Sequence, residues 1–172
     1  IIKYIGPDGV VEIPAQIDGV TVTAIAEKAF LGRTNVTAVT IPNSVVSIGN
    51  FAFYQLTKLE SVYMGNGVQT IGTQAFSECK GLKNLTLSSS LNTIGTSCFS
   101  NCLVLTELAI PNSVTVIGEK AFFNCAKLTS LTLGNGVQTI GAEAFGQCKS
   151  LTGISIPATT TSIGDGALTG CG

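Results

Sequence analysis

The chain has no histidine and no tryptophan, and only 11% of its 172 residues are charged. The absence of histidine removes the commonest general base of enzymes and a frequent metal ligand. Nine basic residues against ten acidic ones give a net charge of −1, with no basic excess to meet a phosphate backbone. The composition therefore argues against an enzyme and against nucleic acid as a partner.

Long apolar runs are also missing. Hydrophobic residues make up 45% of the chain and the mean hydropathy is +0.46, yet no apolar run approaches the roughly 18 residues that a membrane helix needs. We therefore expect no membrane-spanning segment. The six cysteines include no Cys-x-x-Cys pair, and without histidine we expect neither a metal site nor a cofactor.

What the chain does have is a repeat. Isoleucine recurs every 23 residues, and glycine follows it in every unit except the first, where Ala26 stands instead. A fixed period of this kind indicates a repeat array, in which neighbouring units bury a shared core. The glycine indicates either a tight bend or a close approach to the neighbouring unit. The repeated isoleucines are Ile25, Ile48, Ile71, Ile94, Ile117, Ile140 and Ile163.

One unit shows what each position contributes. Leu85 and Leu87 lie two residues apart, which places both on one face of a short strand. We expect one such strand per unit, so that stacked units form a parallel sheet along one side. The stretch Ala75 to Cys79 lacks β-branched residues and predicts a helical or 3₁₀ turn. An internal aromatic ladder is expected from Phe30, Phe53, Phe76, Phe99, Phe122 and Phe145.

These motifs carry a family resemblance. The pattern of Leu82, Leu85 and Leu87 followed by Ile94-Gly95, repeated along the chain, resembles the BspA-like leucine-rich repeats. The resemblance implies a leucine-rich repeat solenoid over residues 25–172, with six full 23-residue repeats and a truncated seventh. Residues 1–24 would form a lead-in or cap segment.

The same resemblance implies a function. BspA-like proteins are secreted or displayed on the surface of microbes, where they bind host matrix or cell-surface proteins or help cells to aggregate. We therefore expect a non-enzymatic adhesion module with an extracellular or cell-surface location. The residues after Ile1 show no charged region followed by an apolar one, so the expected location rests on the resemblance alone.

Five of the cysteines keep the 23-residue period and so share one packing position. These are Cys79, Cys102, Cys125, Cys148 and Cys171. Neighbours in register have parallel Cβ vectors, which does not suit a disulfide, and we expect free thiols. Cys98 instead takes the position of an alanine, four residues before Cys102. It is either a slightly larger core residue, which we favour, or a reactive thiol or a bridge to Cys102.

A partner would contact the outward positions of the strands, most of which carry small side chains. The richest group lies in the central units and consists of Glu60, Tyr63, Lys83, Asn84, Thr86 and Glu107. Tyrosine favours a binding role, whereas a solvated strand face is the simpler interpretation. A second aromatic group, Phe51, Tyr54 and Phe123, takes positions that are mostly polar or small elsewhere. It is either a second, exposed contact site or local packing, and we favour packing.

Two features favour a different function, a passive spacer that displays another domain. Residues 41–82 and 110–151 are identical at 25 of 42 positions, an offset of three units that indicates block duplication. The outward strand positions also offer few large side chains. The last unit reaches Gly172 before its strand begins. We therefore expect the array either to continue or to associate end to end with a neighbouring molecule, because an uncapped core is unfavourable in water.

Overall fold

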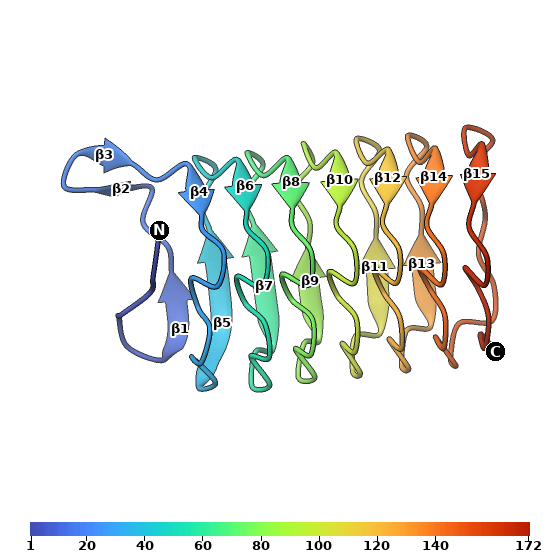
Figure 1. The fold of residues 1–172 in the computed structure, drawn as a ribbon, viewed down its shortest axis with the longest axis horizontal. Helices are drawn as coiled ribbons and strands as arrows, with labels where there is room; N and C mark the ends of the chain where they lie inside the picture. The colour runs from blue at the N-terminus through green and yellow to red at the C-terminus, as the bar shows by residue number, and fades with distance from the viewer.

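Each repeat forms one coil, and the coils stack along a single axis from the N-terminus to the C-terminus (Figure 1). The computed structural model describes residues 1–172, and all of its regular elements are strands. The stacking confirms the predicted leucine-rich repeat solenoid with a parallel sheet on one side. The structure also contains a second parallel ladder, which the sequence analysis did not predict.

The second ladder is built from the isoleucine position of every coil. It is a continuous seven-stranded parallel sheet with no break in its order. Isoleucine pairs with isoleucine throughout, as in Ile48 opposite Ile71, and every one of these isoleucines except Ile163 is buried in the core. The strands are β4 (Ala24–Ile25), β6 (Ser47–Ile48), β8 (Thr70–Ile71), β10 (Thr93–Ile94), β12 (Val116–Ile117), β14 (Thr139–Ile140) and β15 (Ser162–Ile163).

The predicted leucine strands form the opposite side, and here the sheet is interrupted. Four strands pair in the order β1 (Gly9–Glu12), β5 (Val36–Ile41), β7 (Ser61–Met64) and β9 (Asn84–Thr86). The next two, β11 (Glu107–Ala109) and β13 (Ser130–Thr132), pair only with each other. A short antiparallel hairpin of β2 (Gln16–Ile17) and β3 (Val20–Thr21) precedes the array.

The predicted helical or 3₁₀ turn is wrong. Between the two ladders the inner coils from Ile71 onward contain two successive hydrogen-bonded turns, such as Gly72 to Ala75 and Phe76 to Cys79. The third residue of each turn has a positive φ, 52° at Gln74 and 63° at Glu78, which is the geometry of a type II turn. A right-handed helix cannot contain such residues.

These turns recur in every coil because they are stabilised along the axis. The amide of Phe53 donates to the carbonyl of Ala75 in the next coil, and Phe76 donates to Cys98, both at 2.8 Å. A third hydrogen-bonded ladder therefore joins the coils on the turn side. Its bonds offset the cost of the left-handed backbone, which falls on ordinary side chains such as Ser97 and Lys120.

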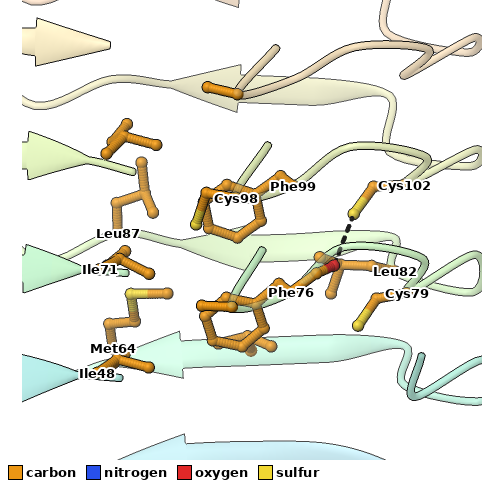
Figure 2. Packing of buried hydrophobic residues seen from close by; sticks show 14 of the residues in the cluster. Ile48, Met64, Ile71, Phe76, Cys79, Leu82, Leu87, Cys98, Phe99 and Cys102 are labelled. Carbon is orange, nitrogen blue, oxygen red and sulfur yellow. Dashed lines mark hydrogen bonds between the residues drawn. The ribbon is translucent and has the colours of Figure 1, made fainter. Parts of the chain in front are cut away.

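The predicted aromatic ladder forms the centre of the core. The six phenylalanines from Phe30 to Phe145 are fully buried and stack with ring centroids 4.6–5.4 Å apart. Figure 2 shows Phe76 and Phe99 in this arrangement. At the N-terminal end, Tyr4 stacks on Phe30 at 4.6 Å. Tyr4 lies outside the 23-residue register, so the repeat pattern did not predict its place.

The glycine after each isoleucine allows a close approach, not a tight bend. These glycines do not have positive φ values. A Cβ on Gly118 would lie 2.8 Å from the carbonyl carbon of Gly95 in the preceding coil, closer than side-chain atoms normally come. Ala26 fits because no full coil precedes it. Its amide instead bonds to the carbonyl of Ile1.

All six cysteines are free thiols, as expected. Those at the periodic position donate a hydrogen bond to a phenylalanine carbonyl in the preceding coil, for example Cys102 to Phe76 at 3.6 Å (Figure 2). Cys98 is fully buried among core residues. Burial raises the pKa of Cys79 to about 12 and that of Cys98 well above its usual value. These buried, protonated thiols are poor nucleophiles.

Candidate functional site

The six candidate residues lie on neighbouring strands of the interrupted sheet or directly before them. Tyr63 is on β7 with 53% of its surface exposed, and it pairs with Thr86 on β9. Asn84 begins β9 and Glu107 begins β11. The structure therefore brings the group together on one exposed face.

Two of the three charged candidates form an ion pair with each other, and the third has no charged partner. Lys83 Nζ lies 3.1 Å from a carboxylate oxygen of Glu60, with both side chains more than half exposed. An exposed pair of this kind contributes at most about 1 kcal/mol to stability, so a partner could replace it at little cost. Glu107 forms no ion pair and its carboxylate accepts no hydrogen bond from the chain.

The break in the sheet falls inside this group. One coil earlier, the amides of Lys83 and Asn84 donate to the carbonyl of Glu60. The equivalent bond, 23 residues later, would run from the amide of Thr106 or Glu107 to the carbonyl of Lys83. That bond is absent, and β9 and β11 do not pair. The wider interval between the two strands is visible in Figure 1, whereas β10 and β12 on the other side of the coils remain paired.

The strand β11 pairs with its other neighbour, β13. The amide of Ile110 donates to the carbonyl of Thr132 in the following coil at 2.8 Å, which continues this parallel ladder. The same coil carries Leu103 and Val104 at positions that hold Lys80 and Gly81 in the coil before it. This bulky apolar pair is the one signal in the sequence that coincides with the break.

At this break a groove lies across β9, β11 and β13, and we call it the β9/β11 groove. Its first part has a volume of about 430 Å³ and is lined by ten residues, only three of them hydrophobic. These include four of the candidates, Lys83, Asn84, Thr86 and Glu107. Glu60 and Tyr63 lie outside the lining. Thr106, Ser130 and Thr132 also line the groove and were not among the candidates, because their small side chains gave no signal of binding.

A second hollow continues the groove toward the ends of the strands. It has a volume of about 350 Å³ and shares Leu85, Thr86 and Ala109 with the first part. Its far end is apolar, with Ile110 and Pro111 among the lining residues. Leu85 occupies a core position but remains only half-buried, because β11 does not cover it.

The second aromatic group lies elsewhere. Phe51 and Tyr54 are half-buried and contact each other edge to face, with ring centroids 5.7 Å apart. The Nζ atom of Lys28 lies 5.7 Å from the Phe51 ring. Phe123 packs beside Gly146 in the turn ladder. These contacts agree with the interpretation of local packing.

Two further observations concern chemistry and membranes. The structure contains no cluster of three or more cysteine, aspartate or glutamate side chains that could hold a metal ion. It also contains no long apolar helix of the kind that crosses a bilayer.

Stacked coils, a parallel strand sheet and an exposed strand face define the chain as a solenoid repeat protein. A family model described as the BspA type leucine rich repeat region matches six copies over residues 13–129 and 47–172. The chain therefore belongs to the BspA-type leucine-rich repeat family. Such solenoids are typically non-enzymatic scaffolds, and leucine-rich repeat proteins generally bind other proteins.

Solved structures agree with this assignment. The chain is 36% identical to the leucine-rich repeat protein TpLRR of T. pallidum, with a TM-score of 0.90 over 95% of this chain and 76% of that one. It is 33% identical to a leucine-rich repeat protein of Bacteroides ovatus, with a TM-score of 0.84 over 97% of this chain and 44% of that one. The chain thus spans less than half of the Bacteroides protein.

A leucine-rich cell surface protein of Faecalibacterium prausnitzii shares the fold at 24% identity, with a TM-score of 0.50 over 96% of this chain and 68% of that one. Among curated proteins of known function, none matches this chain.

Proposed function

We propose that the chain is a non-enzymatic protein-binding module whose contact surface is the strand face over β7, β9 and β11. The observation that carries the proposal is the β9/β11 groove, which interrupts an otherwise periodic sheet at the richest group of polar and aromatic side chains. Periodic positions serve the fold in every coil. The interruption of the sheet occurs at one coil only, in the middle of an exposed face, and can therefore serve a specific contact with a partner.

The chemistry of this face supports a protein partner. Tyr63 is the large exposed side chain on it, and exposed tyrosines are common anchors at protein interfaces. Around it lie an easily broken ion pair, Lys83 with Glu60, and the unpaired carboxylate of Glu107. A partner can therefore gain both an aromatic contact and charged hydrogen bonds.

The family supports the location and the partner class that we propose. BspA-type proteins act at microbial surfaces, so the proposal places this module outside the cell, where it binds host matrix or cell-surface proteins and contributes to adhesion. The buried thiols fit either an oxidising or a reducing environment, because no disulfide is needed to hold the coils together.

The test is capture of the purified chain on a panel of immobilised matrix and cell-surface proteins. We expect at least one member to retain the wild type. Tyr63→Ala and Lys83→Ala should weaken retention, since they remove the anchor and the cation. Thr70→Ala is the matched control, because Thr70 is exposed on β8 of the opposite ladder. Equal retention of all four proteins would remove this face from consideration.

A passive spacer is the second candidate. It is favoured by the duplicated block and by the small side chains on most outward strand positions. A spacer predicts no retention on any member of the panel. It also predicts that every substitution on the strand face leaves the behaviour of the chain unchanged.

End-to-end association is a separate proposal that the last coil supports. At this end of the array Ile156 and Ile163 are 37% and 52% exposed, whereas the apolar residues at the same positions of inner coils are buried. Sedimentation velocity over a range of concentrations should show reversible association, and Ile163→Lys should reduce it. A monomer at all concentrations would exclude this contact.

A further inference from the structure

We propose that the β9/β11 groove holds an arginine side chain of the partner, with its guanidinium group against the carboxylate of Glu107. The inference rests on the proposed protein-binding function and names the chemistry that the partner presents. Three observations carry it: an unpaired carboxylate, a hollow beside that carboxylate on the outward face of the strands, and a lining rich in hydrogen-bond acceptors.

The charges around the groove do not balance. Lys83 and Glu107 are the two charged residues that line it. The Nζ atom of Lys83 lies 3.1 Å from a carboxylate oxygen of Glu60, whereas no lysine or arginine forms an ion pair with Glu107. Two carboxylates and one ammonium group therefore leave one negative charge on this face. A single cation from the partner would neutralise it, which is the charge complementarity expected of an interface.

The hollow exists because a small residue interrupts a row of larger ones. In the outward row that runs across the strands, Ala109 stands between Thr86 and Thr132, and Tyr63 precedes them. Ala109 and Glu107 lie two residues apart on β11 and so share one face. The hollow has a volume of about 430 Å³, and Thr86, Glu107 and Ala109 at its surface are exposed. A side chain can therefore enter it from outside, without any separation of the strands.

The rest of the lining supplies hydrogen-bond acceptors. Five neutral polar residues line the groove, and none of their side chains forms a hydrogen bond within the chain. A guanidinium group carries five N–H donors in a planar fork, matches a carboxylate with two parallel bonds and is more weakly hydrated than an ammonium group. Arginine therefore suits this lining better than lysine. The five residues are Asn84, Thr86, Thr106, Ser130 and Thr132.

The floor of the groove suits the aliphatic part of the same side chain. Leu85 is half-buried, and together with Ala109 it lines both hollows of the groove. Long cationic side chains pack their methylene groups on apolar surface and keep the charged end among polar groups. An arginine stem over Leu85 and Ala109 removes this apolar surface from water and brings the guanidinium group to Glu107.

The experiment titrates the isotope-labelled chain with three small probes and follows its amide signals by NMR. The probes are N-acetyl-arginine methylamide, the lysine counterpart, and the citrulline counterpart, which has nearly the shape of arginine without its charge. We expect the arginine probe to bind weakly, as a single side chain does, and to shift the signals of Glu107 to Ala109. The citrulline probe should bind at least about fivefold more weakly, and the lysine probe should lie between the two.

Two variants, each with a matched control, locate the site. Glu107→Gln removes the charge but keeps the size, and it should weaken the arginine probe at least about tenfold. Glu12→Gln should not, although Glu12 is also an exposed carboxylate without an ion pair, on β1 of the same side. Ala109→Tyr copies the residue two coils earlier and fills the hollow, so it should weaken the probe about as much. Thr40→Tyr on β5 lies outside the groove and should leave binding unchanged.

Three results would overturn the inference. They are equal binding of the arginine and citrulline probes, equal binding by the wild type and Glu107→Gln, or no shift of signals in β9 and β11. Thermal unfolding of each variant checks that it is folded. If the chain captures matrix proteins and Glu107→Gln captures them equally well, the protein-binding function stands and the arginine inference fails. If the arginine probe binds in the groove but no matrix protein is captured, the arginine site stands and the proposed function fails.

Discussion

Adding one methyl group at Gly118 should destabilise the array more than the same change at Gly153. A Cβ at Gly118 would lie 2.8 Å from both the carbonyl carbon of Gly95 and the amide nitrogen of Thr96. Both contacts are backbone atoms, which cannot rotate away. A Cβ at Gly153 would meet nothing within 4 Å, and neither glycine has a positive φ. Comparing the two alanine variants therefore measures the effect of steric contact on stability, because backbone conformation restricts neither position.

The expected magnitudes follow from this geometry. Gly118→Ala must push two coils apart by several tenths of an ångström, which strains the bond from the Gly118 amide to the Ile94 carbonyl, now 2.9 Å. Overpacking of this kind costs about 2–3 kcal/mol. Gly153→Ala should stabilise the fold by about 0.5 kcal/mol, because alanine restricts the unfolded chain.

The assay is urea unfolding followed by circular dichroism, with hydrogen exchange at the Ile117–Gly118 segment as a local readout. Gly118→Ala should lower the free energy of unfolding and speed exchange in β10 and β12. The reasoning is refuted if the two variants differ by less than about 0.5 kcal/mol, since the distinction between a filled and an open site would then carry no energy.

Three other predictions concern single positions in the core and turns. Burial raises the pKa of the Cys98 thiol, so above about pH 9 the unfolded chain loses a proton that the folded chain keeps, and stability falls by about 1.4 kcal/mol per pH unit. Cys98→Ala should flatten the alkaline branch of the unfolding free energy by that slope, and parallel curves would contradict this. Ser97 has a φ of 51°; Ser97→Gly, which copies Gly166, should raise stability by about 0.5–1 kcal/mol in the same urea assay. Phe99→Ala should cost about 4 kcal/mol, and Phe99→Leu, which copies Leu168, clearly less. Equal melting temperatures for these two variants would show that the volume left empty at this position does not set the cost.

The 23-residue period determined most of the fold. It predicted the stacked coils, the leucine strands and the phenylalanine ladder, because each of these depends on one residue type at one position of every coil. It also predicted free thiols at Cys79 and its equivalents, since neighbours in register point the same way. Such features repeat in space whenever they repeat in sequence.

The turns were not predicted for a related reason. Residues with a positive φ, such as Gln74 and Glu78, are ordinary polar side chains with no preference for that conformation. Their geometry is imposed by hydrogen bonds to the next coil, at a separation of 22 residues. Local sequence carries no information about bonds of that kind, so a short run without β-branched residues was read as a helical turn.

The candidate site, like the fold, was predicted in part from the sequence. Composition alone identified the strand face around Tyr63, Lys83 and Glu107 as the richest in chemistry. That β9 and β11 do not pair there is a property of the stacked coils, because β11 forms its ladder with β13 alone. The sequence by itself thus determined what each coil contains and which way its side chains point. Only the tertiary structure decided where the coils stop pairing, because pairing is an interaction between coils and is not written in any one of them.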